Sequence, residues 1–281
     1  MSISKIKSYA KINLSLNITG KTKLLHKIES IIAFINLYDL ISIKRSRFKK
    51  HKVLFTGKFS KRIHKNNTVI RLLKILEKKK LIGNKKFHII IDKKIPNMSG
   101  LGGGSMNAAT ILRYFMKKKI IRIKETEAKH IAKLIGSDVI LGFNNTNSIL
   151  TSKNKILRFR KIKNFHTLIL KTNINCSTKK IFKKVRNFEK PKLNKPSKKM
   201  FNLNYLKGMT NSLEPIVFSK YPNLKKVKSD LENLSKPDFV RMTGSGSAIV
   251  AYYQSKDRCD HAKKRIIQRY KNCWCITAKT I

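Results

Sequence analysis

The stretch Pro96-Asn97-Met98-Ser99-Gly100-Leu101-Gly102-Gly103-Gly104-Ser105-Met106-Asn107-Ala108-Ala109-Thr110 decides the fold. It follows the β-branched run Phe87-His88-Ile89-Ile90-Ile91-Asp92, which is typical of a strand, and it leads into apolar residues at helical spacing. Glycines let backbone N–H groups converge on an anion, and the first turn of a helix presents further unpaired N–H groups. The order strand, glycine loop, helix therefore predicts a phosphate-binding site.

The glycine cluster departs from the common nucleotide-binding motifs. A P-loop ends in Gly-Lys-Ser or Gly-Lys-Thr, whereas Ser105 and Met106 follow Gly104 here, and the cluster lacks the third glycine of a dinucleotide fingerprint. The His-Arg-Asp and Asp-Phe-Gly signatures of protein kinases are absent from the sequence. The sequence therefore predicts a phosphate loop of another class, with a flexible surface turn as the alternative.

The charge of the chain is strongly positive. Its 281 residues are enough for one large domain or two medium ones, and they include 65 lysines and arginines against 14 acidic residues, a formal net charge of +51. Such an excess is typical of nucleic-acid binding, but here it is spread over the chain in short groups such as Lys78-Lys79-Lys80. Many lysines accompany isoleucine and asparagine, which indicates drift toward A/T-rich codons; a polyanion-binding role is the alternative.

The four cysteines favour a reducing compartment. They are too few for a disulfide framework in a chain of this length, and Cys273-Trp274-Cys275 lacks the second pair that a structural zinc site needs, so we expect no structural metal. The N-terminus lacks the continuous apolar core of a signal peptide, and no window of 18 apolar residues occurs. The sequence therefore predicts a cytoplasmic protein that does not span a membrane.

The apolar pattern predicts a mixture of helices and strands. Strands are expected over residues 12–18 and 167–171, a hairpin over residues 30–43, and two further strands within 239–253, on either side of residues 243–247. Helices are expected over residues 68–80, over a segment that ends at Ile135, and over residues 257–270. Residues 191–199 are expected to form a loop. A composition break over residues 144–155 predicts two domains, over residues 1–152 and 153–281.

Three further segments accompany the glycine loop. They are Tyr9-Ala10-Lys11-Ile12-Asn13-Leu14, Gly136-Ser137-Asp138-Val139 and Met242-Thr243-Gly244-Ser245-Gly246-Ser247. In order and spacing, the four segments resemble those of the GHMP small-molecule kinases, nearly from end to end. The most specific parts are residues 10–14 and 100–105 with the following Asn107-Ala108-Ala109. Within that superfamily the chain most resembles the enzymes that act on 4-diphosphocytidyl-2-C-methyl-D-erythritol.

The resemblance implies a fold and an activity. The fold would be α+β, with an N-terminal ribosomal-protein-like α/β domain that binds ATP and a C-terminal ferredoxin-like α+β domain. The activity would be phosphorylation of the 2-hydroxyl of the cytidylated methylerythritol by ATP with Mg²⁺, in non-mevalonate isoprenoid biosynthesis. The expected partner is this small molecule, with at most non-specific nucleic-acid binding, no membrane, and a monomeric or homodimeric state.

The resemblance also implies a set of site residues. Lys11 and Asp138 would form the catalytic pair: a carboxylate can take the proton of the acceptor hydroxyl, and a neighbouring lysine keeps that carboxylate ionised. The residues expected to bind the nucleotide are Pro96, Ser99, Gly100, Leu101, Gly102, Gly103, Gly104, Ser105 and Met106, and those expected to bind the acceptor are Asn13, His26, Phe182, Gly244 and Ser245.

Each of these residues also has an ordinary structural interpretation. Asp138 would cap the next helix, and Lys11 would be one more surface lysine. His26 and Phe182 would be core or surface residues, and residues 243–246 would be a turn.

The chain departs from the resemblance in two places. Ser105-Met106 stands where the family has two serines, so position 106 offers no hydroxyl. The segment of residues 22–26 is shorter than its counterpart, and Leu25 stands where relatives place a tyrosine against the cytosine. Two other classes stay open: a GHMP kinase that acts on mevalonate, homoserine or a sugar, and an RNA-binding or ribosome-associated protein, although no RNP-like motif is present.

Overall fold

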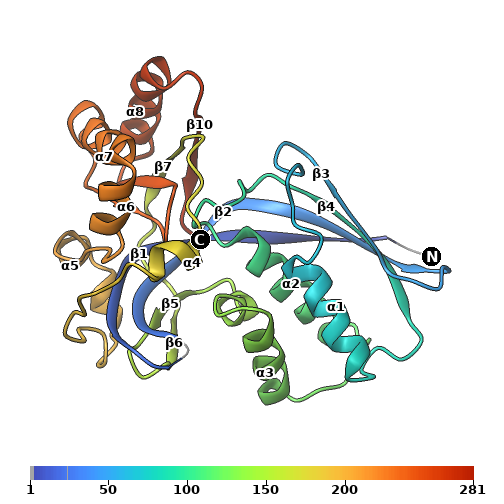
Figure 1. Cartoon of the computed structure of the whole chain (residues 1–281). Helices are drawn as coiled ribbons and strands as arrows, with labels where there is room; N and C mark the ends of the chain where they lie inside the picture. Colours follow the sequence, from blue (N-terminus) through green and yellow to red (C-terminus); the bar gives the residue numbers. More distant parts are fainter. Residues whose placement is uncertain (1–2, 24) are drawn as a thin grey trace. The chain divides into compact units, whose positions relative to one another are not determined.

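The computed structural model describes residues 3–23 and 25–281 (Figure 1). The chain divides into two compact units, each built from several segments. The first unit comprises the described residues up to Ala10, Leu37–Asn97 and Gly102–Asn145, and the second comprises Lys11–Asn36, Met98–Leu101 and Thr146–Ile281. The domain boundary between residues 152 and 153 stays a prediction.

Two long strands, β1 (Ser4–Lys21) and β2 (His26–Ser46), contribute to both units. The strand expected over residues 12–18 is confirmed within β1. The hairpin expected over residues 30–43 is wrong, because β2 runs straight through this segment. The segment contains no glycine or proline that would turn the chain. Its two halves instead pair with different strands, since Ser30 lies opposite Leu150 and Leu40 lies opposite Asp92.

The first unit packs helices on a small sheet (Figure 1). The second half of β2 pairs antiparallel with β4 (Lys86–Asp92), which pairs in parallel with β3 (Lys52–Thr56). Residues of β4 alternate between buried and half-buried, as expected for a strand with one face on the core. The helices are α1 (Thr68–Lys78), α2 (Gly103–Lys117) and α3 (Glu125–Ile135), followed by the 3₁₀ helix η1 (Val139–Phe143).

The apolar faces of the helices pack in the core of the first unit. Leu72 and Leu76 of α1 and Ile111 and Phe115 of α2 pack in one cluster with Ile89 and Ile91 of β4. These residues recur at the three- and four-residue spacing that the sequence shows, so the predicted strand, glycine loop and helix are confirmed as elements in that order.

The second unit contains an antiparallel sheet in the order β10-β7-β9-β8. Its strands are β7 (His166–Lys171), β8 (Phe239–Met242), β9 (Ile249–Tyr253) and β10 (Trp274–Lys279). Leu224 of α7 (Pro222–Ser235) and Ile266 of α8 (Lys256–Arg269) join the same core cluster as Leu168 and Ala251 of the sheet. The two strands expected on either side of residues 243–247 and the terminal helix are therefore confirmed.

The remaining elements of the second unit are short. They are β5 (Asn147–Leu150), β6 (Ile156–Phe159), α4 (Thr178–Phe182), the 3₁₀ helix η2 (Lys198–Phe201), α5 (Leu203–Lys207) and α6 (Glu214–Lys220). Four to seven residues are too few to show a helical period, so the sequence did not predict these helices. Among the described residues, no helix is both long and apolar enough to cross a membrane.

Candidate active site

The exposed part of the glycine loop lies in the first unit. Residues 102–105 are exposed or half-buried, whereas Leu101 before them and Met106 after them are buried. Gly102 has a φ of +73°, a left-handed conformation that favours glycine, and α2 begins directly after it. Because Gly102 has no side chain to cap the helix, the first N–H groups of α2 are available to an anion. The geometry suits the phosphates of a nucleotide.

Two side chains define the surroundings of this loop. Thr68, the first residue of α1, donates its hydroxyl to the Gly104 carbonyl over 2.6 Å. Met106 packs in the core, where a methyl group added to Gly142 would lie 3.1 Å from its Sδ. The N–H of Met106 donates to the Gly102 carbonyl over 2.9 Å. The side chain of Met106 is therefore taken up by core packing and its N–H by the helix, and its role in nucleotide binding stays a prediction.

Asp138 also belongs to the first unit. It stands between the end of α3 at Ile135 and the start of η1, and its side chain is half-buried. Its position is that of a helix cap, yet its carboxylate makes no capping hydrogen bond to η1. The capping interpretation therefore does not account for this carboxylate, whose role as proton acceptor stays a prediction.

Lys11 lies in the second unit and is buried, with 3% of its surface exposed. Its ammonium donates to Asn13 Oδ1 over 2.7 Å, and Asn13 Nδ2 donates to the Ser30 hydroxyl over 2.8 Å. The N–H of Asn13 in turn binds the Thr243 hydroxyl over 3.0 Å. Lys11 is thus not a surface lysine, and Asn13 holds its ammonium in place.

The first part of the glycine loop packs against the second glycine-rich segment within the second unit. The N–H of Lys11 donates to the Leu101 carbonyl over 3.0 Å, and the N–H of Ala248 donates to the Ser99 carbonyl over 3.1 Å. Any side chain at Gly100 would overlap the Thr243 carbonyl, so this close approach requires glycine. The structure therefore brings Lys11, the start of the first loop and the second loop together.

The second glycine-rich segment is anchored on both sides. Asn211 Nδ2 donates to the carbonyls of Met242 and Gly244, over 2.7 and 2.9 Å. The Ser245 hydroxyl lies 2.9 Å from the hydroxyl of Thr178, the first residue of α4. Gly244 has a φ of +56°. This segment therefore joins the Lys11 cluster to the helix that ends with Phe182.

An aromatic cluster surrounds His26 in the second unit. The ring of Phe182 lies 5.3 Å from the His26 ring, and the ring of Phe188 lies 6.4 Å from it, measured between centroids. Burial, with a smaller contribution from Lys21, lowers the pKa of His26, which favours the neutral imidazole. A neutral imidazole both donates and accepts a hydrogen bond, and the two phenyl rings offer faces to a planar base.

Sequence reasoning missed Phe188. Its ring is 47% exposed, although the next residue, Glu189, is fixed to β1 by an N–H that donates to the Ile18 carbonyl over 2.8 Å. The available signal was a second phenylalanine six residues after Phe182 in a segment rich in lysine. Leu25 is 67% exposed, and Leu24, also in the shortened segment, lies outside the described residues.

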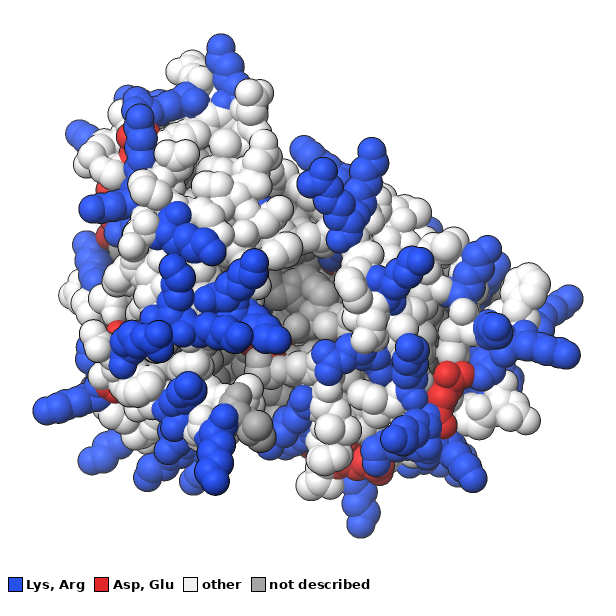
Figure 2. All heavy atoms as spheres, viewed as in Figure 1, with Lys and Arg blue, Asp and Glu red and all other residues white. Residues whose placement is uncertain are grey.

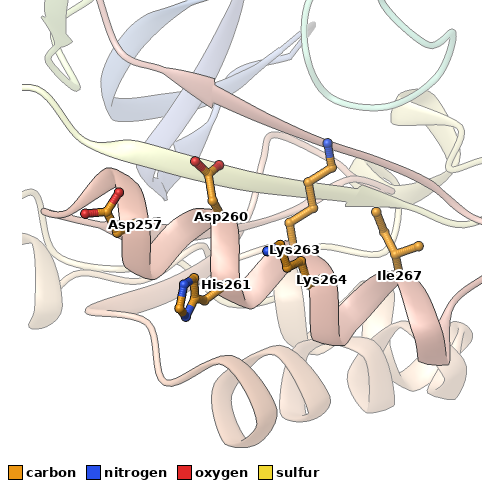
Figure 3. Close-up of a pocket in the computed structure, with 6 residues that line it drawn as sticks. All are labelled: Asp257, Asp260, His261, Lys263, Lys264 and Ile267. Atoms are coloured by element: carbon orange, nitrogen blue, oxygen red, sulfur yellow. The ribbon is translucent and has the colours of Figure 1, made fainter.

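A separate hollow of about 540 Å³ lies along α8 (Figure 3). Its lining comes from one helix and consists of Asp257, Asp260, His261, Lys263, Lys264 and Ile267. None of these is a predicted site residue. The Lys256 ammonium lies 2.7 Å from Asp260 along the same helix. The lining of this hollow therefore shares no residue with the site described above.

Comparison with known proteins identifies the family. Residues 67–148 match the GHMP kinases N terminal domain, and residues 185–272 match the GHMP kinases C terminal family. The chain is 52% identical, over all 281 residues and the whole length of the relative, to 4-diphosphocytidyl-2-C-methyl-D-erythritol kinase of Pelagibacter ubique. The chain belongs to the 4-diphosphocytidyl-2-C-methyl-D-erythritol kinase family.

A more distant member agrees with this family, and solved structures share the fold. The 4-diphosphocytidyl-2-C-methyl-D-erythritol kinase of Clostridioides difficile is 28% identical, with 99% of this chain and 96% of the relative covered. A crystal structure of 4-(cytidine 5'-diphospho)-2C-methyl-D-erythritol kinase superposes with a TM-score of 0.79, at 20% identity, with 98% of this chain and 99% of that chain covered. Homoserine kinase from Cytophaga hutchinsonii gives a TM-score of 0.73 at 14% identity, covering 100% and 95%. The protein is a small-molecule kinase with the α+β GHMP kinase fold, as its sequence predicted.

Proposed function

We propose that the chain transfers the γ-phosphoryl group of ATP to the 2-hydroxyl of 4-diphosphocytidyl-2-C-methyl-D-erythritol, giving the 2-phosphate and ADP. The observation that carries this proposal is the 52% identity, from end to end, to the Pelagibacter ubique kinase of that name. The reaction belongs to non-mevalonate isoprenoid precursor biosynthesis. Free thiols at Cys176, Cys259, Cys273 and Cys275 support a reducing cytoplasm as its location.

The nucleotide is proposed to bind along the glycine loop. The open N–H groups at the start of α2 suit the phosphates, and the helix dipole adds favourable potential there. The described residues contain no group of three or more acidic, histidine or cysteine side chains that would hold a metal ion. Mg²⁺ is therefore proposed to be held chiefly by the ATP phosphates and water, with few protein ligands, and it would neutralise phosphate charge when bound.

Asp138 and Lys11 are proposed to act on the acceptor hydroxyl. The proton of the 2-hydroxyl passes to the Asp138 carboxylate while the oxygen forms its bond to the γ-phosphorus and the bond to the β-phosphate oxygen breaks, releasing ADP. Lys11, which Asn13 holds over 2.7 Å, contributes a fixed positive charge that stabilises the developing oxyanion.

The cytosine of the acceptor is proposed to bind at His26. Phe182 and Phe188 supply aromatic faces on the same side of the unit as the neutral imidazole, which supplies hydrogen bonds. The oligomeric state is proposed to be monomer or homodimer, and nucleic-acid binding is proposed to be non-specific at most.

A coupled ADP-release assay tests the proposed function. Cytidylated methylerythritol is the acceptor, and homoserine, mevalonate, galactose and free methylerythritol are the matched controls. We expect ADP release only with the cytidylated acceptor, and phosphorus NMR of the product should show a new monophosphate ester. Turnover of homoserine, mevalonate or galactose in preference to the cytidylated compound would assign the chain to a different GHMP kinase reaction.

A further inference from the structure

Two buried carboxylates of β2 take no part in the proposed chemistry. Asp39 lies in the first unit and Glu29 in the second, and neither side chain has measurable exposure. Buried carboxylates are costly unless several donors satisfy them. The donors that surround each of them reveal a common arrangement.

Asp39 joins the two flanks of the glycine loop within the first unit. Its Oδ1 accepts the N–H groups of Lys94 and Ile95, over 2.8 and 2.9 Å, just before the loop. Its Oδ2 accepts Asn107 Nδ2 over 3.0 Å, on α2 just after the loop, and forms an ion pair with Lys93. One carboxylate thus holds the chain where it enters the loop and where it leaves it.

The segment that Asp39 holds packs directly on the start of α2. A methyl group added to Gly103 would lie 3.0 Å from Ile95 Cγ2 and 3.1 Å from the Lys93 ammonium. Displacement of Lys93 or Ile95 would therefore move the first turn of α2, whose N–H groups are proposed to bind the phosphates.

Glu29 repeats this arrangement in the second unit. Its Oε1 accepts the N–H of Lys192 over 2.7 Å and Asn17 Nδ2 over 3.0 Å, and its Oε2 accepts the N–H of Leu193 over 3.0 Å. Lys192 and Leu193 follow Phe188 on the segment that faces His26. Each carboxylate thus binds two successive backbone N–H groups and one asparagine amide.

The two asparagine amides depend on these carboxylates. Asn107 is 1% exposed and Asn17 is fully buried, and in the described part of the chain neither Oδ1 atom has a hydrogen-bond partner. The carboxylate therefore provides the hydrogen bond that orients each amide, and no second bond compensates for its loss.

We propose that Asp39 and Glu29 are positioning residues, one for each substrate. Asp39 fixes the geometry of the nucleotide-phosphate loop, and Glu29 fixes the segment that carries Phe188 beside the acceptor base. This inference rests on the proposed function, which assigns the two substrates to these two places.

The first arm of the test replaces Asp39. Asp39→Leu keeps the shape of the side chain and removes its acceptors, and Lys93→Met in the same variant removes the ammonium that would be left buried without its partner. We expect the KM for ATP and the directly measured dissociation constant for ATP to rise by about 10- to 100-fold, as for displaced binding groups in general. The KM for the cytidylated acceptor should stay within about twofold of the parent value.

The second arm is the matched counterpart in the other unit. Glu29→Met removes the acceptors for Lys192 and Leu193, and we expect the KM for the acceptor to rise by about 10- to 100-fold with the KM for ATP unchanged. Asp39→Asn and Glu29→Gln keep the shape of the side chain and one acceptor oxygen. Each should therefore raise the same KM as the apolar substitution at its position, but by a smaller factor. Thermal unfolding of every variant measures folding separately from binding.

The possible results distinguish failure of the positioning roles from failure of the proposed function. A parent protein that does not phosphorylate the cytidylated acceptor would refute the proposed function. An active parent whose Asp39 and Glu29 variants change both KM values alike, or lower only the unfolding temperature while both KM values stay within twofold, would overturn the positioning roles. Opposite selectivity in the two arms would establish them.

Discussion

Burial sets Lys11, Lys93, Lys171 and Arg241 apart from the other basic residues that the structure describes. Each is at most 7% exposed, and each has an oxygen partner. The sequence marked Lys11 through its neighbours Ala10 and Asn13, but nothing in the composition marked Lys93 or its partner Asp39. An acid in a strand looks like a solvent-facing residue, because the sequence pattern does not show which donors will meet it.

At the residue scale, Asp138→Asn tests the proton acceptor. Removal of a positioned proton acceptor typically lowers turnover about 100- to 10,000-fold, and ATP binding should be retained because the glycine loop is untouched. Steady-state kinetics and ATP titration measure the two quantities. Asp257→Asn, at an exposed position of α8, is the control and should match the parent. More than half of parental turnover in Asp138→Asn would exclude the assignment.

Gly103→Val tests the loop itself. The first atom of a side chain at Gly103 already lies 3.0 to 3.2 Å from Ile95, so valine displaces that segment and the start of α2. We expect loss of ATP binding in calorimetry with a native-like circular dichroism spectrum. Gly208→Val is the control, because Gly208 is exposed and its φ is −75°. Equal ATP affinity in Gly103→Val and the parent would mean that the loop is only a turn.

At the element scale, the sequence predicted α1 and the short strands β7, β8 and β9, but it missed the 14-residue helix α7 and the short helices of the second unit. Helix α1 repeats its apolar residues over three turns, and β4 alternates between buried and half-buried residues along its length. Each pattern therefore predicts the type of the element from the sequence alone. The hairpin prediction failed because β2 has one pattern but pairs with three strands, β1, β4 and β5, and pairing between distant strands leaves no mark on either strand alone. The sequence predicted His26 and Phe182 of the aromatic cluster but not Phe188, because only the contact of Phe188 with His26 in the structure reveals it.

Phe182→Leu and Phe188→Leu test the aromatic cluster. Stacking of a base on an aromatic ring is worth about 1 to 3 kcal/mol, so each change should raise the KM for the cytidylated acceptor at least fivefold while the KM for ATP stays constant. Phe48→Leu removes a 71% exposed ring from the first unit and should leave both constants unchanged. An unchanged acceptor KM in both variants would remove the rings from the site.

At the scale of the whole molecule, the positive charge covers the surface broadly. Figure 2 shows lysine and arginine side chains over the visible face with few acidic residues between them. The motifs proposed to act in catalysis and nucleotide binding could be recognised because each is contiguous in sequence. The division into two units was not, because each unit combines distant segments.

The spread of charge predicts weak, unselective RNA binding. Contacts to phosphates release counterions, so the affinity for any RNA should fall steeply as salt rises from 50 to 200 mM, by about 10³-fold or more if six phosphates are contacted. Filter binding with unrelated RNA sequences measures both selectivity and salt slope. Tight binding of one sequence that resists salt would favour a specific RNA partner.

The segmented second unit has a consequence for synthesis of the chain. Residues 11–36 are synthesised long before their hydrogen-bond partners, because the Leu16 carbonyl accepts the N–H of Ser212 and the Phe34 carbonyl accepts the N–H of Ile281. At about 5 to 20 residues per second, that delay lasts about ten seconds or more. During this time an apolar strand rich in isoleucine has no partners from the C-terminal half. The nascent chain is therefore expected to need chaperone protection of these strands until Ser212 and Ile281 have been synthesised.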